Sequence, residues 1–115
     1  MSKVDIRDIA FNFSLDIIKL YKQCIVSNEY VLSKQMLKSG TSIGANVEEA
    51  QAAQSKKDFI AKMAVASKES RETKYWLRLI KEGGLLENEE LLNDLISKSE
   101  SFKYNYQNCK NSNEE

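Results

Sequence analysis

The sequence predicts an all-α protein, an antiparallel up-down bundle of four helices. The 115-residue chain has no proline and only 4 glycines, whereas strands joined by tight turns need more of both. Apolar side chains recur at helical spacing in four successive segments. The connections between these segments are short, which makes consecutive helices antiparallel neighbours.

The first helix is expected from about Ile6 to Ser27. Its apolar residues follow the spacing of a single stripe on a helix: Phe13, Ile17, Leu20 and Cys24. Ser27 and Asn28 then supply polar side chains that end this helix and cap the next one.

The second helix is expected from about Glu29 to Gln54, with an apolar stripe formed by Leu32, Met36, Ile43, Val47 and Ala50. Gly40 and Gly44 interrupt it, and each glycine weakens an isolated helix by about 1 kcal/mol relative to alanine. We therefore expect a neighbouring backbone to come close to these two positions.

The third helix is expected to begin after Ser55, an N-cap residue with Asp58 three positions on, and to run to about Glu82. Its apolar and small residues form a heptad seam: Phe59, Met63, Ala66, Ser70, Thr73, Leu77 and Ile80. Gly83 and Gly84 predict a left-handed C-cap.

The fourth helix is expected to begin near Asn88, whose side chain can cap it. Its apolar stripe comprises Leu91, Leu95, Lys98 or Ser99, Phe102 and Tyr106. The residues after Cys109 have nothing to bury. We therefore expect a single domain over residues 1–110 and a disordered tail over residues 111–115.

Composition excludes several classes of function. The 17 basic and 17 acidic side chains balance, which argues against a dedicated nucleic-acid binder. Without histidine or a Cys-x-x-Cys pair, the usual metal sites and a nucleophile with a histidine base cannot be assembled, so we expect no metal, no cofactor and no enzymatic activity. A charged N-terminus and the lack of a long apolar run predict a cytoplasmic protein without a membrane span.

The charge is nevertheless unevenly distributed along the chain. Residues 56–82 contain eight basic and four acidic side chains, whereas residues 83–115 contain three basic and seven acidic side chains. Within the first segment, a basic stripe at helical spacing is a candidate nucleic-acid contact: Arg71, Lys74, Arg78 and Lys81. The opposite charges of the two segments favour the alternative, in which this stripe pairs, within or between subunits, with acids of the fourth helix: Glu87, Glu89, Glu90 and Asp94.

Two further groups of residues are candidates for structural roles. Polar side chains at one level of the second and third helices predict a buried hydrogen-bonded layer that fixes register or subunit geometry: Ser42, Asn46, Glu49 and Glu72. A carboxylate metal cluster of Glu49, Glu69 and Glu72 is rejected, because di-iron bundles require histidine. Small and aromatic residues predict an oligomer interface: Gly40, Gly44, Tyr75 and Trp76.

Four segments together resemble one family: Ser-Ile-Gly-Ala-Asn-Val-Glu-Glu-Ala (42–50), Ser-Lys-Lys-Asp-Phe (55–59), Ala-Ser-Lys-Glu-Ser-Arg-Glu-Thr-Lys-Tyr-Trp-Leu (66–77) and Gly-Leu-Leu (84–86). The family comprises proteins encoded in intervening sequences of bacterial 23S ribosomal RNA genes. The resemblance implies an up-down bundle that assembles into a ring-shaped homopentamer, and it brings no active site. A related branch, the accessory variability proteins of diversity-generating retroelements, partners a reverse transcriptase and contacts nucleic acid.

The functional hypothesis from the sequence is therefore a non-enzymatic homo-oligomeric ring that contacts RNA, DNA or a nucleic-acid-handling protein. The alternative is a structural or protein-binding oligomer with no affinity for nucleic acid. Binding to RNA at two salt concentrations distinguishes them, because phosphate contacts weaken steeply as salt rises.

Overall fold

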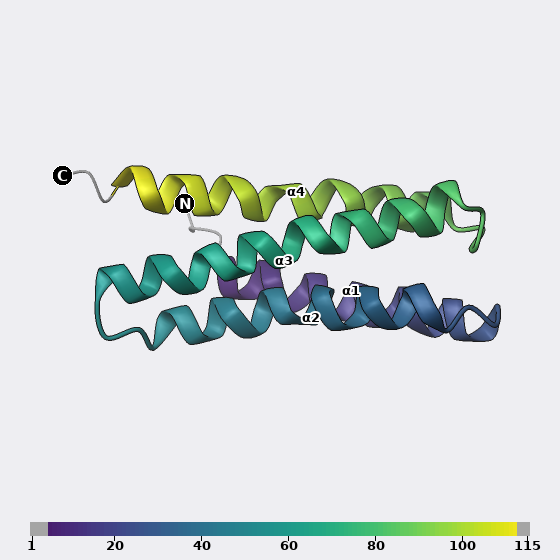
Figure 1. Cartoon of the computed structure of the whole chain (residues 1–115), viewed down its shortest axis with the longest axis horizontal. Coiled ribbons are helices and arrows are strands. Elements are labelled where there is room, and N and C mark those ends of the chain that lie inside the picture. Colours follow the sequence, from purple (N-terminus) through teal and green to yellow (C-terminus); the bar gives the residue numbers. More distant parts are fainter. Residues whose placement is uncertain (1–4, 113–115) are drawn as a thin grey trace.

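The computed structural model describes residues 5–112 and contains four helices joined by short connections (Figure 1). These are α1 (Ile6–Val26), α2 (Val31–Gln51), α3 (Lys56–Glu82) and α4 (Glu89–Ser112). Consecutive helices run in opposite directions, and residues 5–112 include no strand. The predicted all-α up-down four-helix bundle is confirmed.

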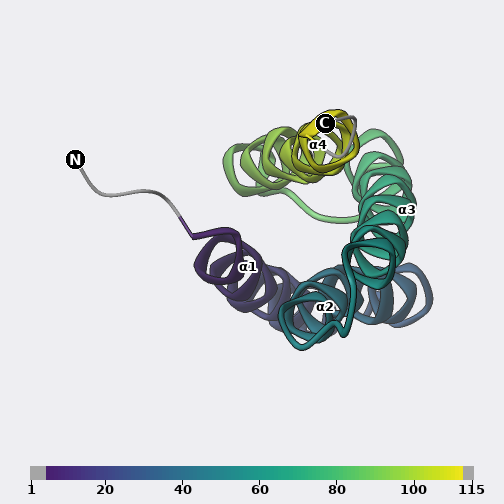
Figure 2. The same cartoon turned by 90° about the vertical axis from the view of Figure 1, so that its left-hand side faces the viewer.

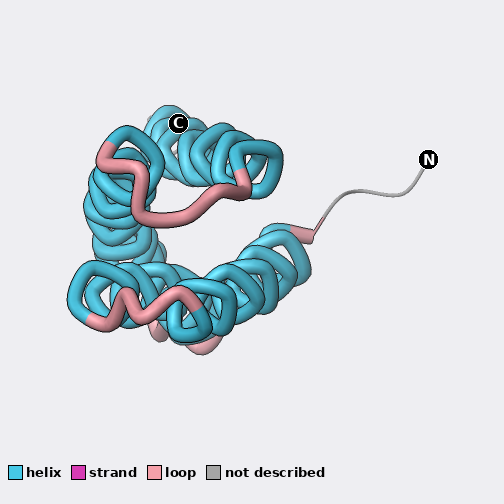
Figure 3. The backbone as a smooth tube through the Cα atoms, turned by 90° about the vertical axis from the view of Figure 1, so that its right-hand side faces the viewer, coloured by secondary structure: helices cyan, strands magenta, loops and turns pink. Residues whose placement is uncertain are grey.

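The four helices form an open C when viewed along the bundle (Figure 2, Figure 3). α2 packs against α1 and α3, and α3 packs against α4, whereas α1 and α4 meet over a smaller area. Side chains join these two outer helices. The rings of Phe13 and Phe102 meet edge to face with centroids 5.5 Å apart, and Asn88 Nδ2 donates to Gln23 Oε1 over 2.8 Å.

The starts of α3 and α4 and the end of α3 follow the signals in the sequence. The Ser55 hydroxyl accepts from the Asp58 N–H at 3.0 Å, and Asn88 Oδ1 accepts from the Leu91 N–H at 3.3 Å. The backbone of Gly84 is left-handed, with φ of 68°, and its N–H donates to the Lys81 carbonyl in a Schellman motif.

The turn between α1 and α2 differs from the expectation. Asn28 does not cap α2; its backbone is left-handed, with φ of 62°, and it ends α1 as a glycine ends α3. Glu29 provides the cap instead, because its carboxylate accepts the N–H groups of Val31, Leu32 and Ser33. At the other end of the chain, α4 includes residues 111 and 112, which were expected in the tail, and residues 113–115 lie outside the described residues.

The core is apolar along most of the bundle. Eleven large apolar residues of the four stripes are expected in the core, and nine of them are buried: Phe13, Ile17, Met36, Ile43, Val47, Met63, Leu77, Ile80 and Leu95. Phe59 and Leu91 are only half-buried, so the expectation was wrong for these two. Phe59 lies in the first turn of α3, at the end of its seam, and on α4 the buried stripe begins at Leu92 rather than at Leu91.

A polar contact lies within this core where α2 meets α3. The hydroxyls of Ser39 and Thr73 share a hydrogen bond with an O–O distance of 2.9 Å, and the Thr73 hydroxyl lies 2.7 Å from the Glu69 carbonyl oxygen. Both side chains are buried. Because serine and threonine are small, the two helices pack closely at this level, and the hydrogen bond between them favours one register.

We expect Thr73→Val, which keeps the shape and removes the hydroxyl, to lower the free energy of unfolding by about 1 kcal/mol. Urea denaturation measures this change. Adding Ser39→Ala should cost less than the sum of the two single changes, because both remove the same hydrogen bond. Strictly additive losses would show that the two hydroxyls are not coupled. Ser97→Ala, at an exposed position of α4, is the control.

Candidate nucleic-acid interface

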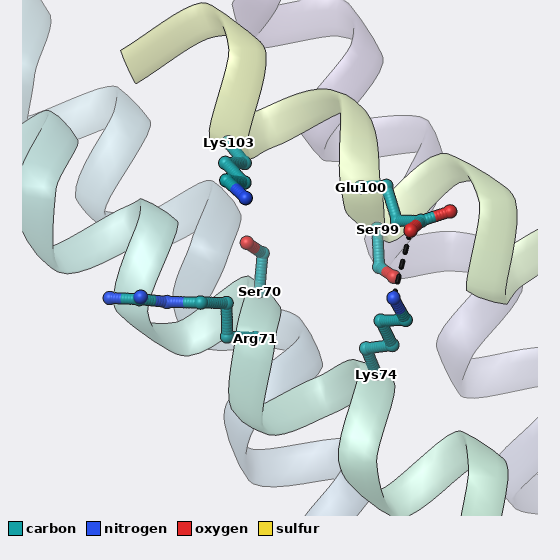
Figure 4. Close-up of a pocket in the computed structure, with 6 residues that line it drawn as sticks. All are labelled: Ser70, Arg71, Lys74, Ser99, Glu100 and Lys103. Atoms are coloured by element: carbon teal, nitrogen blue, oxygen red, sulfur yellow. Dashed lines mark hydrogen bonds and ion pairs between the residues drawn. The ribbon is translucent and has the colours of Figure 1, made fainter. Parts of the chain in front are cut away.

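Arg71 and Lys74 of the basic stripe lie at the groove between α3 and α4, where Lys103 approaches from α4 (Figure 4). Because α3 and α4 are antiparallel and in contact, these three cations, separated in the sequence, line the same hollow. We call this hollow the basic groove; its lining residues are Ser70, Arg71, Lys74, Ser99, Glu100 and Lys103.

One carboxylate lies among these cations. Lys74 Nζ and Glu100 Oε2 form an ion pair at 2.8 Å, and the hydrogen bond from Lys74 lowers the pKa of the Glu100 carboxyl from its usual value. Glu100 is therefore ionised at neutral pH and partly neutralises Lys74. Within residues 5–112, Arg71 and Lys103 form no ion pair. These two cations carry the uncompensated charge of the groove.

The two hydroxyls of the basic groove are already used as donors. Ser70 Oγ donates to the Ser67 carbonyl at 2.7 Å, and Ser99 Oγ donates to the Ile96 carbonyl at 2.6 Å. Figure 4 shows the Ser70 oxygen facing the ammonium of Lys103. An anion in the groove would therefore be bound by the three cations, and such contacts are sensitive to charge and salt rather than to base sequence.

The other two residues of the predicted stripe lie apart from the basic groove. Arg78 Nε pairs with Glu82 Oε2 of its own helix at 3.2 Å, and Lys81 lines a separate hollow near the turn after α3. The expected pairing of the stripe with Glu87, Glu89, Glu90 and Asp94 is not found within the described residues. Asp94 pairs instead with Lys98 at 2.9 Å.

The sequence pattern missed Lys103, because a stripe is defined along one helix whereas the groove is formed by two. A usable signal was present: Lys103 follows Ser99 by one helical turn, and Ser99 belongs to the buried stripe of α4. A residue beside that stripe lies at the edge of the packed face of α4 and can therefore reach a neighbouring helix.

The predicted buried polar layer does not form within the chain. Ser42 and Asn46 are half-buried, and Asn46 Nδ2 donates to the Ser42 carbonyl of its own helix at 2.9 Å. Glu49 and Glu72 are exposed, and Glu72 accepts from the indole N–H of Trp76 at 3.1 Å. No hydrogen bond joins these four described side chains across α2 and α3, whereas the buried hydroxyls of Ser39 and Thr73 do form one.

The two glycines assigned to an oligomer interface are needed inside the chain. Gly40 is buried, and a Cβ at this position would lie 2.9 Å from Ile17 Cγ1. A Cβ on Gly44 would lie 3.2 Å from Ser14 Oγ and 3.4 Å from the Ala10 carbonyl oxygen. Both glycines therefore allow α1 to approach α2. The expected approach of a neighbouring backbone is present at Gly44, whereas Gly40 faces the Ile17 side chain. Gly40 is also buried and is therefore not accessible to a second subunit.

The two aromatic residues assigned to the interface differ in environment. Trp76 is half-buried and packs against the core. Tyr75 is 57% exposed, and its ring meets that of Trp76 edge to face with centroids 5.2 Å apart. Tyr75 borders a shallow hollow on the outer face of α3, together with Arg78, Leu79 and Glu82.

A second exposed apolar surface lies on the outer side of α1 and α2. Phe11 is 62% exposed and Leu15 is 49% exposed, and they stand one turn apart on α1. Phe11 also borders a hollow that includes Gly44 and Ala45 of α2. We call these four residues the α1–α2 apolar face. Phe11 and Leu15 lie outside the buried stripe of α1, so the periodicity of that stripe did not predict this face.

The described residues contain no cluster of side chains suited to metal binding. No group of three or more acidic or cysteine side chains in residues 5–112 is arranged to hold a metal ion. Cys24 is buried, and desolvation raises the pKa of its thiol to about 11, with the charge of Glu29 adding to the effect. That thiol therefore stays protonated at neutral pH. None of the four described helices has an apolar stretch of membrane-spanning length.

Comparison with known proteins agrees with the resemblance noted in the sequence. The family model described as 23S rRNA-intervening sequence protein matches residues 2–107. No curated protein matches the chain. A crystal structure of a protein of unknown function from the S23 ribosomal protein family of Bacteroides thetaiotaomicron has 39% sequence identity and a TM-score of 0.83, and the match covers 89% of this chain and 94% of that one. The chain belongs to the 23S rRNA-intervening sequence protein family.

Proposed function

We propose that this protein is a cytoplasmic, non-enzymatic homo-oligomer that contacts the phosphate backbone of RNA or DNA through the basic groove between α3 and α4. The observation that carries the proposal is the convergence of Arg71, Lys74 and Lys103 from two helices around one hollow. The solved neighbour is described as a member of a ribosomal protein family, which makes RNA the first ligand to test.

Charge and hydrogen bonding favour a phosphate as the group that occupies this groove. Arg71 and Lys103 have no ion pair among the described residues, so an anion can reach them without displacing a partner. Lys74 becomes a third contact once Glu100 moves away. Guanidinium and ammonium groups bind phosphate oxygens by charge-assisted hydrogen bonds. The zero net charge of the chain does not oppose this contact, because most of the compensating acids lie elsewhere.

Oligomerisation is supported by the α1–α2 apolar face. Large apolar side chains exposed side by side on a helix favour burial against another protein surface. A ring requires a second, complementary surface on the same subunit, and Val65 and Leu79 are exposed apolar residues of α3 that can contribute to it. A homopentamer, which the family resemblance implies, would repeat the basic groove five times and so strengthen a weak contact by multivalency.

The alternative function is a structural or protein-binding oligomer without nucleic-acid affinity. The ion pair of Lys74 with Glu100 favours it, because this contact already satisfies one cation of the groove. The two functions differ in their response to salt and to the removal of Glu100.

We expect Glu100→Gln to increase the affinity for single-stranded RNA by about 2- to 10-fold, because it frees Lys74 for one more phosphate contact. The slope of log affinity against log salt should become steeper by about 0.7, the value for one added contact to a single strand. Fluorescence anisotropy at several salt concentrations measures both quantities. Glu90→Gln is a matched control, since Glu90 is exposed on α4 in a different hollow. Arg71→Gln should weaken binding, and RNA affinity that none of these changes alters would contradict the proposal.

We expect the wild-type protein at micromolar concentration to scatter light as an oligomer, with a mass near five subunits. Phe11→Glu should lower that mass while the helical content stays constant, because it places a charge in the α1–α2 apolar face. Asn12→Glu adds the same charge at the neighbouring exposed position of α1 and should leave the mass unchanged. If the wild-type protein scatters light with the mass of a monomer at every salt concentration tested, the oligomer is ruled out.

A further inference from the structure

An exposed aromatic ring stands beside the basic groove. Tyr75 is 57% exposed, although the residue next to it, Trp76, packs against the core. The edge of one ring meets the face of the other at a centroid distance of 5.2 Å and an interplanar angle of 67°. The indole of Trp76 is itself held by its hydrogen bond to Glu72. The Tyr75 ring therefore contacts Trp76 on one side, and the rest of the ring is exposed to solvent.

Basic and acidic side chains both neighbour this ring, with Glu72 one turn before it and Glu82 in the hollow beside it. Arg71 lies one turn before Tyr75 and Arg78 one turn after it, so both are its neighbours on the surface of α3. Lys74, the preceding residue, belongs to the basic groove. The hollow beside Tyr75 is also lined by Leu79 and by Arg78, whose guanidinium is held by Glu82 at 3.2 Å. An apolar surface flanked by guanidinium groups can accept the flat face of a nucleobase.

We propose that the nucleic acid bound by this protein is single-stranded, and that one unpaired base stacks on Tyr75 while Arg71, Lys74 and Lys103 bind the adjoining phosphates. This inference rests on the proposed function, because it requires that the basic groove bind phosphate. A duplex does not fit the arrangement, since its bases are already stacked on one another and their faces are inaccessible. Single strands offer free base faces, and exposed aromatic residues beside basic grooves bind them with little sequence preference.

The test uses three oligonucleotides of ten nucleotides per strand: a single-stranded uridine oligomer, the same backbone without bases, and an RNA duplex. Trp76 is the only tryptophan of the chain and touches Tyr75, so its fluorescence reports on a base placed against that ring. We expect the uridine strand to quench Trp76 and to bind at least several-fold more tightly than the abasic strand. The abasic strand and the duplex should leave the fluorescence of Trp76 nearly unchanged.

Variants of the ring separate stacking from phosphate binding. Tyr75→Leu should weaken binding of the uridine strand by about 5- to 150-fold, the loss associated with one base–aromatic stack. It should leave the affinity for the abasic strand unchanged, and Tyr75→Phe should retain tight binding. Tyr30→Leu removes another exposed tyrosine, at the turn between α1 and α2, and should have no effect.

Three other outcomes would overturn the inference, and each points to a different cause. Equal affinities for the three oligonucleotides, with no effect of Tyr75→Leu, would leave phosphate binding in place and remove the stacking. A change in oligomer mass caused by Tyr75→Leu, with no change in RNA affinity, would show that the ring is a contact between subunits. Failure of every oligonucleotide to bind, even at low salt, would overturn the proposed function and this inference together.

Discussion

The close packing of α2 against α3 is the constraint on which the rest of the structure depends. Ser39 and Thr73 occupy positions where larger side chains would hold the two helices apart, and their hydroxyls share a buried hydrogen bond. With this side of α3 committed to α2, the opposite side of its seam faces α4 and brings Arg71 and Lys74 to Lys103. The outer surface that remains carries Tyr75. One contact thus sets the orientation of every functional candidate on α3.

The charge distribution explains how a neutral chain can present a cationic surface. α3 is basic and the segment after it is acidic, yet among the acids of that segment up to residue 112 only Glu100 lines the basic groove. Its ion pair with Lys74 occupies the place that a phosphate oxygen would take. We regard Glu100 as an internal competitor that lowers the affinity of each subunit. If the groove binds phosphate as proposed, tight binding would depend on several grooves acting together, which would link binding to oligomerisation.

The sequence predicted the helices well because their signals are local. Ser55 and Asn88 cap helices as expected, and the heptad seam of α3 is buried over most of its length. Errors arose where two helices must be placed in register. Lys103 was missed because the groove depends on how α4 lies against α3. Asn46 was expected to be buried, but it is half-buried and bonds within its own helix. Periodicity gives the face of a helix but not the level at which a neighbour meets it.

In the proposed function, the basic groove and the exposed side of α3 form one nucleic-acid surface. Photo-crosslinking of the protein to single-stranded RNA, followed by mapping of the modified peptides, locates that surface. We expect crosslinks to fall in residues 68–78 of α3 and 99–103 of α4, with Tyr75 among the modified residues. Crosslinks confined to α1 and α2 would contradict the proposal, because neither helix contributes a residue to the lining of the basic groove and Tyr75 lies on α3.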